Sequence, residues 1–167
     1  YQDLFKRREQ KEQYATYLQG LMSDLPNKSV ETMMLNLNGD DPQAIRNMQH
    51  FLSQGSWQDS AILQRHWQEV RQDLDDENAV FIVDSSGFPK QGNESVGVKR
   101  QWCGQLGKKA NCQVGVFLSY ASQHGYTLLN RRLYLPQEWV EDKDFAERRT
   151  KCGIPQDITF KTQPALA

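Results

Sequence analysis

The sequence predicts an α+β fold, in which a helical region over residues 1–78 precedes a small antiparallel sheet within residues 79–167. Two observations predict this fold. Apolar residues recur at three- and four-residue spacing as far as Leu74, as on one face of a helix. From Ala79 onward, β-branched and aromatic residues instead gather in short runs, and a short loop containing Gly125 joins the last two runs. A loop of that kind makes the flanking strands antiparallel neighbours.

The first region should contain four helices. The expected helices span residues 4–22, 29–36, 42–55 and 56–74. The third has the clearest start, because Asp41 is a good N-cap and Pro42 suits the first turn. Ser56 is the expected cap of the fourth helix, which ends in the acidic run Asp75, Asp76 and Glu77.

The third and fourth helices are joined at Gln54, Gly55 and Ser56, as in a helix-turn-helix. In that interpretation the fourth helix would present Gln64, Arg65, Gln68 and Arg71 to DNA. An ordinary helical hairpin is the alternative. The charge of residues 1–78 favours the hairpin, because 8 Lys and Arg stand against 13 Asp and Glu.

The second region should contain three strands and a helix. The expected strands span residues 79–84, 112–120 and 126–134, and the helix lies near residues 141–151. The first strand is expected to be central and to end at Asp84, since two serines, Gly87 and Pro89 follow. A carboxylate at the end of a buried strand is accessible to a hydrated metal ion, although a loop-capping Asp has the same appearance.

The 27-residue connection from Ser85 to Asn111 is rich in glycine and lysine. Residues 79–167 hold 12 Lys and Arg against 8 Asp and Glu. We expect five cations of the connection to bind the phosphate backbone of DNA: Lys90, Lys99, Arg100, Lys108 and Lys109. The alternative is a solvated surface loop without a ligand.

Composition excludes other classes of protein. No apolar run in the 167 residues approaches the length of a membrane span, and no signal peptide is recognisable near Tyr1. The three cysteines form no CxxC pair, so we expect reduced cysteines in a cytoplasmic protein.

Three segments carry a resemblance to a known family. They read FIVDSSGFPKQG, SVGVKRQWCGQLGKKANCQVGVFLSYAS and LNRRLYLPQEW, and they resemble the hallmark segments of insertion-sequence DDE transposases, the DDE superfamily endonuclease family. The resemblance covers about residues 4–160. It implies an RNase H-like catalytic domain, an acidic DDE triad and two magnesium (or manganese) ions. Asp84 falls where the family places its first catalytic Asp.

The resemblance also implies binding partners, and it shows that part of the catalytic triad is missing from this chain. The partners are DNA at the transposon ends and at the target, and a homo-oligomer is compatible with the sequence without being specified by it. The acids after residue 134 match no segment that would supply the second Asp or the Glu. We therefore expect the chain to be the first part of a transposase, to be inactive alone, and to bind the metal only within the complete protein.

Two interpretations from other classes stay open. The chain could be a DNA-binding or assembly module that is derived from a transposase and has no catalytic activity. It could also be a metal-dependent adhesion-type domain, since Asp84, Ser85 and Ser86 match the start of a DxSxS motif while Phe88 departs from it. An adhesion-type domain requires parallel strands, whereas the RNase H-like interpretation requires an antiparallel hairpin over residues 112–134.

Overall fold

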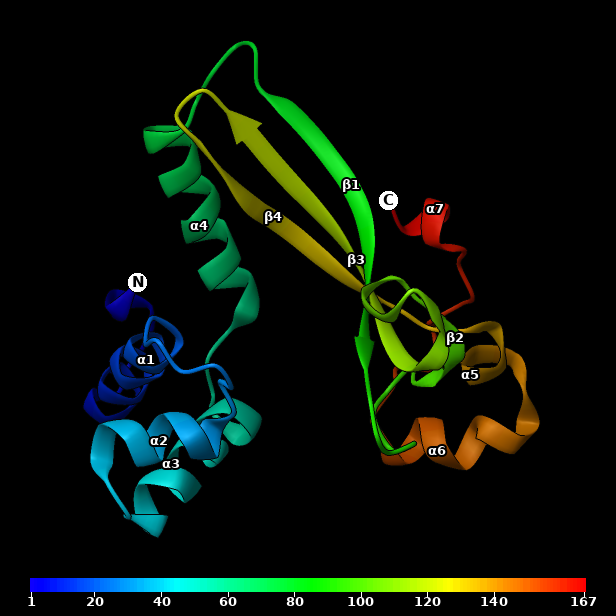
Figure 1. Ribbon diagram of the computed structural model, residues 1–167, viewed down its shortest axis with the longest axis horizontal. Helices are drawn as coiled ribbons and strands as arrows, with labels where there is room; N and C mark the ends of the chain where they lie inside the picture. The colour runs from blue at the N-terminus through cyan, green and yellow to red at the C-terminus, as the bar shows by residue number, and fades with distance from the viewer. The chain divides into compact units, whose positions relative to one another are not determined.

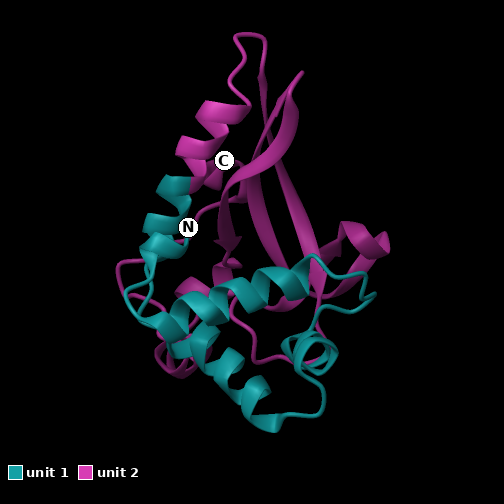
Figure 2. Ribbon diagram, turned by 90° about the vertical axis from the view of Figure 1, so that its left-hand side faces the viewer, with its two compact units in different colours: residues 1–65 teal, residues 66–167 magenta.

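The computed structural model describes all residues from 1 to 167, in two compact units of residues 1–65 and 66–167 (Figures 1 and 2). The boundary between the units falls within α4 (Asp59–Asp73). The change to strand patterning at Ala79 therefore lies inside the second unit, and the domain division expected at residue 78 stays a prediction. None of the helices combines the length and apolar character that crossing a membrane demands.

The first unit is helical, as predicted. It contains the 3₁₀ helix η1 (Gln2–Leu4), α1 (Arg8–Leu21), α2 (Val30–Asn38), α3 (Pro42–Gln54) and the start of α4. The Asp41 cap is confirmed, since its carboxylate accepts a hydrogen bond from the Gln43 amide at 2.9 Å. The expected Ser56 cap is wrong. The Ser56 hydroxyl lies 3.3 Å from the Gln10 side-chain amide that donates to it, and α4 begins only at Asp59.

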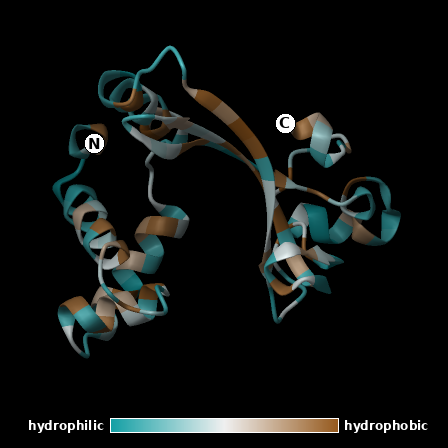
Figure 3. Cartoon of the chain, turned by 45° about the horizontal axis from the view of Figure 1, so that its top comes forward, coloured by the Kyte–Doolittle hydropathy of each residue, from teal (hydrophilic) through white to brown (hydrophobic).

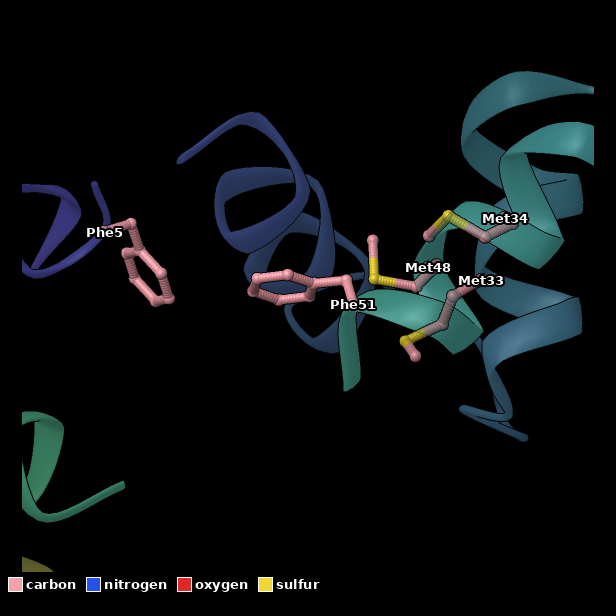
Figure 4. Packing of buried hydrophobic residues seen from close by; sticks show 5 residues of the cluster. All are labelled: Phe5, Met33, Met34, Met48 and Phe51. Carbon is pink, nitrogen blue, oxygen red and sulfur yellow. The ribbon is translucent and has the colours of Figure 1, made fainter. Parts of the chain in front are cut away.

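Five buried side chains form the core of the first unit: Phe5, Met33, Met34, Met48 and Phe51 (Figure 4). Met48 on α3 has no exposed surface, and Phe5 lies within 5.8 Å of Phe51, measured between ring centroids. Methionine side chains are flexible and fill irregular gaps between helices. The three methionines thus allow three short helices to pack together although few of their residues are buried.

We expect Met48→Ala to lower the free energy of unfolding by about 2–5 kcal/mol, because it leaves a cavity in this core. Met22→Ala is the control, since Met22 is 83% exposed, and it should change stability by less than about 0.5 kcal/mol. Denaturant unfolding of both variants measures the difference. Equal stability of the two variants would show that the methionine cluster is not a cooperative core.

The second unit is built on a four-stranded antiparallel sheet. Its strands are β1 (Val80–Pro89), β2 (Lys99–Cys103), β3 (Lys108–Ser122) and β4 (Gly125–Tyr134). The central strand is β3, because Cys112 pairs with both Pro89 and Lys99, and Val114 pairs with both Gly87 and Tyr134. It follows that β1 lies along one side of β3, while β4 and β2 share the other side. The α+β fold class is confirmed, and it is consistent with part of an RNase H-like fold.

The predicted end of the first strand at Asp84 is wrong, because β1 continues to Pro89. Gly87 lies within the strand, and glycine suits this position because a Cβ there would come within 3.2 Å of the Cys103 backbone. Pro89 is tolerated for a different reason. The next residue, Lys90, donates its amide to Asn111 of β3, so the N–H that Pro89 lacks would point to the open edge of the sheet.

The strand order also corrects the expectation that β1 is central, because β1 pairs only with β3. A fourth strand, β2, was not predicted and lies within the 27-residue connection, and β3 begins at Lys108 and not at residue 112. The pairing of residues 99–103 with residues 108–112 thus orders much of a segment that the sequence presented as a loop.

Side chains of directly paired residues share a face of a sheet, so the register assigns each strand residue to one of two faces. We call one of them the Asp84 face. It carries Ile82, Asp84, Ser86, Phe88, Phe117, Arg131 and Leu133, and toward β2 it carries Arg100, Trp102, Lys109 and Asn111. The opposite face is the buried one, since Cys112, Val114, Val116 and Tyr120 of β3 are all buried there.

The second half of α4 packs against the buried face. His66 and Trp67 hydrogen bond to the carbonyls of Leu128 and Leu129, both at 2.8 Å. The Tyr120 hydroxyl donates to Leu74 at 3.0 Å and accepts from the Asp76 amide at 3.1 Å. These bonds fix the turn from α4 into β1, so they also fix where β1 begins.

The turn before β1 has its own electrostatic support. The Asp76 carboxylate accepts hydrogen bonds from the backbone amides of Asn78 and Gln123, which lower the pKa of Asp76. Beyond this turn, β1 opens with the hydrophobic run Val80 to Val83 (brown in Figure 3), and all four residues are exposed. Phe81, at 66% exposure, still contacts Tyr120 edge-on.

The chain closes with short helices where one helix over residues 141–151 was expected. They are α5 (Gln137–Glu141), the 3₁₀ helix η3 (Lys143–Phe145), α6 (Ala146–Lys151) and α7 (Gln163–Leu166). The single helix is interrupted because Asp142 is extended and caps η3 through the Asp144 amide. Trp139 of α5 is fully buried and donates its indole N–H to Val98 at 2.9 Å.

Candidate functional site

Asp84 lies in the middle of β1 with its side chain exposed to solvent. Its Oδ1 accepts a hydrogen bond from the adjacent Ser85 amide at 2.7 Å. The strand fixes the backbone of Asp84 by pairing it with Phe117, while the other edge of β1 has no strand beside it. Asp84 is thus a carboxylate on a fixed backbone that is open to a ligand from the solvent and from the free edge.

A cation shares the cross-strand row of Asp84. Asp84 pairs with Phe117, and Phe117 pairs with Arg131 of β4, so all three side chains project from the Asp84 face. Two strand spacings separate the backbones of Asp84 and Arg131, which is about 10 Å. A phosphate group of a bound DNA strand could therefore contact Arg131 while a neighbouring part of that DNA strand lies over Asp84.

Three of the five predicted DNA-binding residues are exposed and gather at the β2 end of this face. Arg100 pairs with Asn111, and Lys109 lies two residues from Asn111 along β3. Lys90 also joins this row, because its amide donates to the Asn111 carbonyl at 2.9 Å. Lys90, Arg100 and Lys109 are in no ion pair of the structure.

Lys99 and Lys108 are placed differently. Lys99 pairs with Cys112, and Lys108 pairs with Cys103, which puts both lysines on the opposite face from Asp84. Lys99 also forms a salt bridge with Glu138, and its ammonium lowers the pKa of that carboxylate. The structure therefore does not gather all five cations on one face.

The segment that carries Lys90 is ordered by its neighbours. The Asn111 side-chain amide donates to the carbonyls of Lys90 and Gly92, at 3.0 and 2.9 Å. Further along, Gln113 donates to Val96, and Arg148 lies 3.5 Å from the Glu94 carboxylate. Side chains from β3 and α6 thus hold a connection that the sequence presents as a long loop.

The acids present do not make up a metal site by themselves. No group of three or more His, Cys, Asp and Glu side chains lies together in the structure. A magnesium site is bound by one or two carboxylates with waters and substrate phosphates, and a two-metal site needs more than one carboxylate. Asp84 alone does not hold a pair of metal ions.

Two residues of this face were missed by reasoning from the sequence. Arg131 was read only as part of a strand, although adjacent strand residues such as Arg131 and Arg132 necessarily lie on opposite faces. Trp102 lay within the supposed loop, and KRQWC has no apolar alternation that would have marked it as a strand. The remaining prediction for the first unit, a helix-turn-helix, stays a prediction, and Arg65 of α4 lies 2.8 Å from the carboxylate of Asp3.

Asp84 is thus an exposed carboxylate on a sheet strand that shares its face with several cations. The comparisons identify the class. The model of the family described as DDE superfamily endonuclease matches residues 1–167, so the chain belongs to that family. Members of this superfamily generally use divalent metal ions.

One relative is described as a probable transposase for insertion sequence element IS701, from Microchaete diplosiphon. It is 30% identical to this chain over 145 residues, which are 86% of this chain and 37% of the relative. The chain thus spans little more than a third of that relative's length. No solved structure matches the chain.

The topology and the family together argue against the adhesion-type alternative. That class requires a parallel arrangement, whereas β3 and β4 are antiparallel over residues 114–134. The DxSxS-like stretch after Asp84 also continues as a strand and does not form a loop that could gather ligands.

We expect Asp84→Asn to leave the free energy of unfolding within about 0.5 kcal/mol of the parent value, because the side chain is exposed and asparagine can still accept the Ser85 bond. Tyr120→Phe on the neighbouring strand is the contrasting variant. It removes a buried hydroxyl that has two partners and should cost roughly 1–3 kcal/mol. Denaturant titration of both variants tests this, and a large loss from Asp84→Asn would indicate a structural role.

Proposed function

We propose that the chain is the portion of an insertion-sequence transposase that binds DNA along the Asp84 face and supplies the first catalytic carboxylate. The observation that supports this most strongly is the register of the sheet, which places Asp84, Arg131, Arg100 and Lys109 on one face, with Lys90 next to Asn111 at its β2 end. In the complete gene product, Asp84 would be one ligand of the magnesium or manganese ions used for strand cleavage and transfer. The other acidic ligands would come from outside these residues.

The cations have the role of holding the phosphate backbone. Neutralising phosphates releases counterions, so binding of this kind is strong at low salt and independent of sequence. Lys90, Arg100 and Lys109 are exposed and unpaired, so they would lose no internal partner on binding. Lys99 is held by Glu138 and Lys108 faces away, so neither is included in the proposed interface.

The proposed substrate also suggests where the protein works. Transposon ends and target DNA are part of the chromosome, so we propose that it acts in the cytoplasm of its host cell. The relative from Microchaete diplosiphon is described as a probable transposase, which supports DNA as the partner without defining the sequence it recognises.

The adjacent lysines Lys108 and Lys109 provide a matched test of the interface. Lys109→Glu should weaken DNA binding and reduce the slope of log affinity against log salt by about one, because one phosphate contact is lost. Lys108→Glu changes the net charge equally but alters the opposite face, so the slope should stay the same. Fluorescence anisotropy with a labelled duplex at several salt concentrations measures both. Identical slopes for the two variants would show that the Asp84 face has no special role in binding.

Catalysis is tested with the complete gene product. Asp84→Asn should reduce metal-dependent strand cleavage on the order of 10³-fold or more, because the side chain loses the charge that binds the metal, while DNA affinity is retained. The 167-residue chain alone should not cleave DNA with either magnesium or manganese. Undiminished cleavage by the Asp84→Asn protein would contradict the catalytic role of Asp84. Full DNA binding without any cleavage by the unaltered gene product would instead favour the non-catalytic module.

A further inference from the structure

Trp102 differs from the other three tryptophans. The indole N–H groups of Trp57, Trp67 and Trp139 donate to the carbonyls of Phe51, Leu129 and Val98, at 2.9, 2.8 and 2.9 Å. The Trp102 indole has no partner in the chain, and the residue is 62% exposed. An indole N–H commonly finds a partner, and a large exposed ring is costly to leave in water. Nothing within the chain accounts for the position of this side chain.

The sheet register places cations next to Trp102 on the Asp84 face. Trp102 pairs directly with Lys109, and Arg100 lies two residues before it on the same strand and face. Lys90 extends the row of Arg100 and Asn111. The ring is therefore an exposed aromatic surface within a group of exposed cations that form no ion pairs.

This combination of groups fits one chemical class of ligand best. A nucleobase has a flat face that stacks on an indole ring, and the attached phosphates would meet the lysine and arginine side chains. The indole N–H could donate to an oxygen of the base or phosphate. A partner protein with an apolar surface would instead have to desolvate the three cations without compensation. Bases within a duplex already stack on each other, so the ligand must be an unpaired base.

We propose that Trp102, together with Lys109 and Arg100, forms a stacking site for an unpaired nucleobase of a DNA strand bound along the Asp84 face. This proposal rests on the proposed DNA-binding function of that face. The partners of Asp84 and Trp102 on β3, Phe117 and Lys109, are eight residues apart, which is about 26 Å along the strand. Trp102 would thus hold the DNA at a distance from Asp84 and take no part in the chemical step.

The test compares single-stranded oligo-dT with a duplex of equal length, using the 167-residue chain. Trp102→Leu keeps apolar bulk but removes the ring, so affinity for the single strand should fall roughly 5- to 150-fold. Its salt slope and its duplex affinity should stay nearly unchanged, because no charge is lost. Phe81→Leu is the control, since Phe81 is a 66% exposed aromatic residue that pairs with Tyr120 on the opposite face, and it should bind like the parent chain.

Tryptophan fluorescence gives a second readout. Stacking on a base should quench Trp102 when oligo-dT is added, and Trp102→Phe should abolish that quenching while it retains more affinity than Trp102→Leu. A circular dichroism melt of each variant establishes that it is folded.

The outcomes separate the two proposals. If the parent chain binds neither DNA, the proposed DNA-binding function fails and the stacking site fails with it. If Lys109→Glu reduces the salt slope but Trp102→Leu leaves single-strand affinity unchanged, only the stacking site is wrong. If Trp102→Leu dissociates an oligomer of the chain without altering DNA binding, the ring is a protein contact and the stacking site is likewise wrong.

Discussion

The second unit depends on the pairing of β3 with neighbours on both of its sides. Side chains alternate between faces with a period of two, so a slip of one residue would exchange the two faces of a strand. In the observed register, the side chains of Val114, Val116 and Tyr120 are buried on one face. Asp84 and Lys109 project from the other, the Asp84 face. Burial of the apolar row therefore stabilises the same register that exposes the charged row.

The Asp84 face carries several charged side chains that would be unstable in a buried core. A carboxylate or ammonium group is costly to bury without a partner, so these exposed groups belong on the face opposite the buried apolar row of β3. Asp84 additionally lies on an edge strand, where another polypeptide segment could approach it from the unpaired side.

Short sequence motifs predicted correctly the helix starts and turns that depend only on residues adjacent in the sequence. Asp41 and Pro42 mark the start of α3 because capping and proline geometry act within one turn. The β3–β4 hairpin was predictable because Gly125 marks its turn, and Gly125 begins β4 with a positive φ of 147°. Asp84 was identified in the sequence through the resemblance and its position in an apolar run, although its strand continues beyond it.

The features that could not be predicted depend on contacts between distant residues. Residues 99–103 contain two cations and a glutamine, so only their pairing with β3 makes them a strand. The order of strands in the sheet also cannot be read from the pattern of a single strand. The expectation that β1 is central was therefore wrong. The separation of Lys108 from Lys109 required the register, because in a loop both would have been equivalent.

Lysine reactivity in the presence and absence of DNA tests the central claim most directly. The chain would be acetylated with limiting reagent, alone and with saturating DNA, and the modified lysines quantified by mass spectrometry. If DNA binds the Asp84 face, Lys90 and Lys109 should be protected while Lys108 keeps its reactivity. Equal protection of Lys108 and Lys109, or protection of Lys108 alone, would contradict the assignment of the DNA-binding face.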